Sequence, residues 1–271
     1  MMQKIIKWIV PLAALLAVGA FLYIAPPGLL GKADGVGYAI CHRISERSFH
    51  IGERQLPMCA RDTGTFTSAA VTLIFLSIIG SKRSGMPTKK IFLTLAAFFL
   101  LWAVDGSNSY LYLIKQTYPG AFPQIPNIYI PNNILRLLTG SGMGMGMGAV
   151  LYAAFNQTAW KEMDPRPALG TWRDLSLLIG TMLLIDLAIL SGSPIALYPI
   201  AFISVLGVVT LLTLIFSVVW MMIMRLENTF TSLREMWLAL AAGLTLALIM
   251  LIVIDLLRLR MTGTWGAFPL G

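Results

Sequence analysis

Charged residues are scarce in this sequence. Asp, Glu, Lys and Arg make up 12% of its 271 residues, about half of the share that a soluble domain carries. Hydrophobic residues make up 57%, and several of their runs reach the roughly 18–20 residues that cross a hydrocarbon core. The composition therefore excludes an ordinary soluble domain and predicts a membrane protein.

Several functional motifs are absent as well. The sequence has no His-Glu-x-x-His motif of a zinc hydrolase, and its Gly-Met alternation at 142–148 lacks the preceding strand that a phosphate-binding loop needs. Its net charge of +8 comes from basic residues spread over short connections, with no basic face. This pattern excludes nucleic acid as a partner and predicts contact with the headgroups of membrane lipids.

Seven hydrophobic runs predict membrane-spanning helices. Helices are expected because a span must satisfy its backbone polar groups internally. The first run predicts an uncleaved anchor, because it ends at Pro26-Pro27 without a clear cleavage site. The spans are expected at about 5–25, 65–80, 91–114, 134–155, 175–193, 197–224 and 236–257.

No second domain is expected. The longest polar stretch, residues 26–64, is too short for an independent core, so residues 1–271 are predicted to form one all-α polytopic bundle. Eleven of the twenty Lys and Arg residues lie at the span ends that share a side with the N-terminus. Because positive charge favours the cytoplasmic side, we expect a cytoplasmic N-terminus in the cell (inner) membrane. Residues 26–64 and the C-terminus are then extracytoplasmic.

Both cysteines and both histidines lie in one short segment, residues 41–64. Three interpretations stay open. Cys41 and Cys59 could close a disulfide in an oxidising compartment, which for a loop of this size stabilises by roughly 3 kcal/mol. Cys41, His42, Cys59 and Asp62 could instead hold zinc or another divalent metal with two sulfur, one nitrogen and one oxygen ligand. The third interpretation is packed thiols and ordinary interfacial histidines.

This segment resembles the signature of an uncharacterised family of predicted prokaryotic polytopic membrane proteins. The resemblance covers about residues 38–148 and implies no function. Where the family has a second cysteine in Cys-Ala-Arg-Cys, this chain has Asp62, which would weaken a site for soft metals. The matching positions are Cys41, His42, Glu46, Arg47, Ser48, Phe49, Gln55, Leu56, Pro57, Cys59, Ala60, Arg61, Thr63, Gly64, Asp105, Gly106, Asn133, Arg136, Thr139 and Gly140.

The predicted spans carry a few costly polar residues. Charges in hydrocarbon usually mark a partner or a site, and those of this chain fall in the middle or outer half of their spans. We therefore expect one extracytoplasmic site roofed by residues 38–64, in which Asp105 pairs with Arg136, whereas Asp186 has no obvious partner. The polar cluster comprises Asp105, Asn108, Asn133, Arg136 and Asp186, and Asp255 lies near the outer surface.

The function predicted from these features is a non-catalytic subunit or partner-binding component of a membrane assembly. Loops are short, catalytic residues cannot be assigned, and glycines at 140, 144 and 148 and at 142 and 146 form faces for close helix packing. Two alternatives stay open. One is a metal-dependent membrane enzyme that acts on a lipid or lipid-soluble substrate at the outer leaflet, with Arg47 and Arg61 contacting an anionic headgroup. The other is a small ion or solute transporter.

Overall fold

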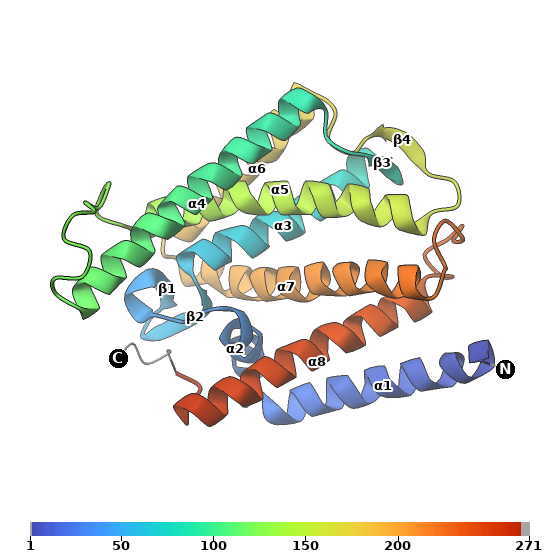
Figure 1. Ribbon diagram of the computed structural model, residues 1–271, viewed down its shortest axis with the longest axis horizontal. Coiled ribbons are helices and arrows are strands. Elements are labelled where there is room, and N and C mark those ends of the chain that lie inside the picture. The colour runs from blue at the N-terminus through green and yellow to red at the C-terminus, as the bar shows by residue number, and fades with distance from the viewer. Residues whose placement is uncertain (1, 267–271) are drawn as a thin grey trace.

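The structure, a computed structural model, describes residues 2–266 and is a helical bundle (Figure 1). The predicted all-α polytopic architecture is confirmed. The elements are α1 (Met2–Ile24), α2 (Leu29–Ile40), the 3-10 helix η1 (Ser45–Arg47), β1 (Ser48–Ile51), β2 (Arg54–Cys59), α3 (Ala60–Ile79), β3 (Arg83–Gly85), α4 (Lys89–Thr117), α5 (Asn133–Ala159), β4 (Asp164–Pro167), α6 (Trp172–Leu190), α7 (Pro194–Ile223) and α8 (Trp237–Thr262).

Among the described residues, six helices are long and apolar enough to cross a membrane: α1, α3, α4, α5, α7 and α8. The predicted fifth span, 175–193, corresponds to α6, a 19-residue helix that also carries Arg173, Asp174 and Asp186. Its charges keep it outside this set, although it lies along the bundle with the other helices (Figure 1). The predicted second span, 65–80, is the latter part of α3, which already begins at Ala60.

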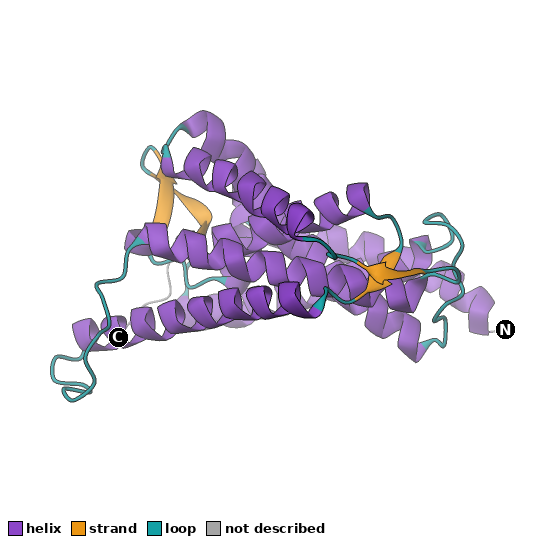
Figure 2. Ribbon diagram, turned by 90° about the horizontal axis from the view of Figure 1, so that it is seen from above, coloured by secondary structure: helices purple, strands orange, loops and turns teal. Residues whose placement is uncertain are grey.

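The polar connections gather at the two ends of the bundle. The helices α1, α4, α6 and α8 run toward the end that carries β1 and β2, and α3, α5 and α7 run away from it (Figure 1). The antiparallel pair β1–β2 and the parallel pair β3–β4 lie at opposite ends (Figure 2). We call the end with β1 and β2 the Cys41 end.

Helices α3 and α5 pack at the centre with their backbones in close approach. A Cβ atom at Gly140 would overlap the Arg61 carbonyl oxygen, one at Gly144 would overlap that of Thr65, and one at Gly148 would lie 2.8 Å from Thr72 Cβ. The alternate glycines of α5 face α4, where a Cβ at Gly142 would lie 3.0 Å from Phe98. Both small-residue faces expected from the sequence therefore form helix contacts.

The outer helices present apolar side chains to their surroundings. On α1, Trp8 is 81% exposed and Leu15 is 70% exposed, whereas its inner face packs against α8. Such a surface suits lipid, because lipid tails are as apolar as these side chains. Buried small and aliphatic side chains fill the space between the helices.

The close contact of α3 and α5 predicts a sharp difference between neighbouring glycines. Gly144→Ala places a methyl group against the Thr65 carbonyl and should destabilise the protein by about 1–3 kcal/mol, the usual cost of overpacking. Gly146→Ala is the matched control, because its Cβ would meet only ordinary contacts at 3.9 Å or more. Unfolding curves of both variants in the same detergent measure the difference. Equal midpoints would show that the backbones are not in close contact.

Candidate functional site

The elements α2, β2 and α3 bring the cysteines together at the Cys41 end. Cys41 follows the last residue of α2, Cys59 ends β2, and Asp62 lies in the first turn of α3. At Gly37 only a glycine fits, because a Cβ atom would overlap the Pro57 carbonyl oxygen of β2. The two sulfur atoms and an Asp62 carboxylate oxygen lie within 4.8 Å of one another.

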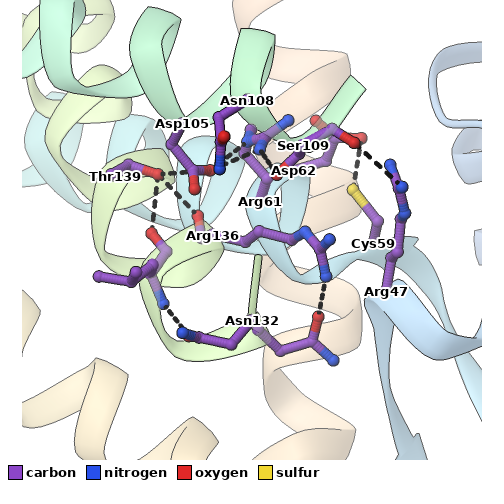
Figure 3. A network of polar contacts seen from close by, with 12 residues as sticks. Arg47, Cys59, Arg61, Asp62, Asp105, Asn108, Ser109, Asn132, Arg136 and Thr139 are labelled. Carbon is purple, nitrogen blue, oxygen red and sulfur yellow. Dashed lines mark hydrogen bonds and ion pairs between the residues drawn. The ribbon is translucent and has the colours of Figure 1, made fainter. Parts of the chain in front are cut away.

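Hydrogen bonds single out the Cys41 sulfur as an acceptor. Backbone N–H groups of Cys59 and Arg43 donate to it at 3.2 and 3.4 Å, and the Cys59 thiol donates to Asp62 Oδ2 at 3.2 Å (Figure 3). The neighbouring Cys59 thiol lowers the pKa of Cys41 well below its usual range. The same interaction, together with burial, raises the pKa of Cys59 well above its usual range. Both residues are buried and free of disulfide bonds in this structure.

The histidines lie further out. His42 is exposed, and its Nδ1 atom lies 3.9 Å from Cys41 Sγ and accepts the Ile44 N–H at 3.4 Å. His50 instead contacts Ser45 Oγ through Nε2 at 3.0 Å. Of the four predicted metal ligands, the structure therefore clusters Cys41, Cys59 and Asp62 and leaves His42 beside them.

Helix α8 fastens this segment through a residue that the sequence analysis did not single out. Arg258 donates hydrogen bonds to the carbonyl oxygens of Tyr38, Cys41 and His42. Its guanidinium carbon also lies 4.0 Å from the centre of the Tyr38 ring. The sequence signal that could have identified Arg258 is its position near the end of a hydrophobic run, where long basic side chains often contact polar groups.

Asp105 forms the buried ion pair of the site, and its partner is Arg61. Arg61 Nε donates to Asp105 Oδ2 at 3.2 Å (Figure 3). The Tyr129 hydroxyl donates to Asp105 Oδ1 at 2.6 Å. The expected pairing with Arg136 is wrong in this structure. The Arg61 guanidinium lies beside Gly106 of α4, with Nη1 3.7 Å from the position that a Cβ atom would occupy there, which is an ordinary contact distance.

Asn108 holds the loop between α4 and α5. It donates to the Tyr129 carbonyl at 3.0 Å and accepts the Ile128 N–H at 2.9 Å. Burial, followed by the hydrogen bond to Asp105, raises the pKa of Tyr129 to about 12. The Tyr129 hydroxyl therefore keeps its proton and remains a donor at any physiological pH.

The remaining members of the predicted cluster divide into two groups. Arg136 donates to Asn133 Oδ1 at 2.8 Å, and Asn133 donates to the Glu46 carbonyl at 3.2 Å, so both join the roof of the site. Asp186 instead accepts a hydrogen bond from Ser141 at 2.9 Å. It lines a mainly apolar cavity of about 390 Å³ between α4, α5 and α6.

Comparison with known proteins agrees with this description. Residues 41–150 match a family described as "Predicted membrane protein (DUF2085)". The resemblance inferred from the sequence is confirmed at this level. An uncharacterized protein of Methanothermobacter thermautotrophicus is 29% identical over 111 residues, which cover 41% of this chain and 83% of that protein. No solved structure matches. The matched range contains the thiol cluster and the Arg61–Asp105 pair, whereas Asp186 and Arg258 lie beyond it.

The ion pair predicts a distinctive double-mutant result. Asp105→Asn leaves Arg61 without a counter-ion and should cost about 3 kcal/mol of stability, near the low end for buried pairs because Arg61 is partly exposed. Adding Arg61→Gln should recover part of this loss. Unfolding in detergent measures the stability of the single and the double variant. Asp164→Asn is the control, because Asp164 pairs with the exposed Arg166, and its stability should not change measurably. Additive effects would contradict a direct pair.

Proposed function

We propose that this protein is a non-catalytic component of a membrane assembly that holds one divalent metal ion, with zinc as the best fit, at Cys41, Cys59 and Asp62. The observation that carries the proposal is the set of three ligand atoms within 4.8 Å of one another. Two sulfur ligands and one oxygen ligand suit zinc or another borderline metal. The ligands come from the end of α2, the end of β2 and the first turn of α3, so a bound metal would tie these three elements together.

The surroundings of the cluster support a charged metal–thiolate site. Two backbone N–H groups donate to Cys41 Sγ, an arrangement that orients a ligand and stabilises a thiolate. Arg47 is buried and Arg61 is largely buried, and both act electrostatically on the cluster residues. Both positive charges favour ionised ligands, although neither arginine forms an ion pair with Cys59 or Asp62 among the described residues.

The position of His42 supports a structural role. Its Nδ1 atom lies 3.9 Å from Cys41 Sγ, so a modest side-chain movement would supply a fourth ligand. Zinc sites with four protein ligands are closed and structural, whereas catalytic sites keep one position open. A closed site of this kind fits a component that stabilises an assembly with other membrane-protein subunits.

A metal-dependent enzyme that acts on a lipid-soluble substrate is the second candidate. The cavity of about 390 Å³ beside Asp186 favours it, because its lining is almost entirely apolar and includes Thr139, which also donates to Asp105 at 3.3 Å. The coordination number distinguishes the two candidates. Four protein ligands to bound cobalt would favour the structural role, and three ligands with a bound water would favour the enzyme.

Metal analysis of the purified full-length protein tests the proposal. We expect about one metal ion per chain, with loss of most of it in Cys59→Ser and weaker retention in Asp62→Asn, because each change removes a ligand. His50→Ala is the control and should retain the metal, since His50 contacts Ser45 and not the cluster. A metal-free protein whose two cysteines are blocked as a disulfide would overturn the proposal.

We also propose that the Cys41 end is extracytoplasmic and that the N-terminus is cytoplasmic. Support comes from the loop between α3 and α4, where residues 81–90 contain Lys82, Arg83, Lys89 and Lys90 and no acid. Positive charge of this density is typical of the cytoplasmic side. The loop lies at the end opposite Cys41 (Figure 1).

Cysteine labelling of intact cells tests this orientation. Gln124 and Ser81 are both exposed. Gln124 belongs to the loop between α4 and α5, and Ser81 to the loop between α3 and β3, and these two loops lie at opposite ends of the bundle (Figure 1). A thiol reagent that cannot cross the membrane should label Gln124→Cys in intact cells and Ser81→Cys only after the cells are opened. The unsubstituted protein is the background control, because its two cysteines are buried. The reverse pattern would invert the orientation.

A further inference from the structure

A second pocket at the Cys41 end lies apart from the metal ligands. It has a volume of about 350 Å³ and is enclosed by η1, the last turns of α4 and the beginning of α5. Its polar lining consists of Glu46, Arg47, Tyr112, Gln116 and Arg136. These residues are far apart in the sequence, so the pocket exists only in the folded protein.

The two arginines of this pocket are buried and have unused donors. Arg136 is 6% exposed and Arg47 is 8% exposed. Arg136 donates to Asn133 Oδ1 at 2.8 Å, and Arg47 donates to the Ser109 carbonyl at 3.2 Å. Arg136 Nε is buried and has no hydrogen-bond partner among residues 2–266. A guanidinium group carries five N–H donors, so both side chains can bind a further acceptor.

The charge of the pocket is positive. Asp105 is paired with Arg61, so its charge is already balanced. Glu46 is the one acid of the pocket lining, and it forms no ion pair within the described residues. Two arginines thus face one exposed carboxylate. Burying a guanidinium without a counter-ion is unfavourable, so the pocket is complementary to an anion.

We propose that Arg47 and Arg136 together bind a phosphate group, presented either by an anionic phospholipid or by free phosphate. Guanidinium groups suit this ligand because their planar N–H pairs match two phosphate oxygens. Tyr112 and Gln116 offer further polar groups on the α4 side, and Ile44 and Leu113 add apolar surface. Helix α5 begins at Asn133, next to the pocket, and the helix dipole of α5 also favours an anion there. This site is distinct from the proposed metal site, because it shares no ligand with it.

Binding of inorganic phosphate tests the site directly. Titration calorimetry of the detergent-solubilised full-length protein should detect phosphate binding that weakens about tenfold or more in Arg136→Gln and in Arg47→Gln, the effect of losing one charge-assisted hydrogen bond. Arg260→Gln is the matched control. Arg260 is an exposed arginine in the last turn of α8, and it does not line the pocket. Its affinity should equal that of the unsubstituted protein.

Native mass spectrometry distinguishes a lipid from a free anion. Protein from nanodiscs that contain equal parts of phosphatidylglycerol and phosphatidylcholine should retain phosphatidylglycerol if the ligand is a lipid, and Arg136→Gln should lose it. Phosphate binding without lipid retention would identify a free anion. If Arg136→Gln does not fold, Arg136→Lys replaces it and should bind several-fold more weakly, because lysine lacks the planar pair of donors. The proposal is overturned if the unsubstituted protein binds neither phosphate nor phosphatidylglycerol. It is also overturned if the variants bind these ligands as tightly as the unsubstituted protein.

Discussion

The close approach of α3 and α5 determines the rest of the structure. Apolar burial does little to drive helices together in lipid, so close packing of small residues carries much of the association. Gly140, Gly144 and Gly148 bring α5 against the backbone of α3, and the Arg61 carbonyl lies directly over Gly140. This contact sets the depth and direction of the first turn of α3. Arg61 then meets Asp105 of α4, and the loop after α4 joins the same network through Tyr129.

The network places two kinds of chemistry at one end of the bundle. The thiols and Asp62 form a cluster suited to a cation, and Arg47 and Arg136 line a pocket suited to an anion. They are adjacent because Asp62 directly follows Arg61, and Arg47 donates to Ser109, whose hydroxyl accepts a hydrogen bond from Arg61. A change at either site could therefore reach the other through the Arg61–Asp105 pair. Both sites lie where helices end, a depth at which charged groups are less costly than at the bilayer centre.

The polar residues show how such a protein limits the cost of burial. Asn108, Asp105 and Asn133 each join two or more segments, and their partners are often backbone groups of loops. A polar group in a membrane domain is costly unless it is hydrogen-bonded. The loop between α4 and α5 satisfies Asn108 and, through Tyr129, adds a hydrogen bond to Asp105. It is therefore part of the site and more than a connection.

The sequence by itself determined the helical membrane bundle, the glycine faces of α5 and the presence of Cys41, His42, Cys59 and Asp62 in one short segment, whose role it left open. These features depend on runs and spacings along a single segment, which local sequence records directly. Only the tertiary structure decided that Asp105 pairs with Arg61, that Asp186 bonds to Ser141 and that Arg258 holds the Cys41 segment. The position of the charged helix α6 alongside the other helices was decided there as well. Contacts between helices depend on the rotation and depth of each helix, which packing with its neighbours sets and which no single segment encodes.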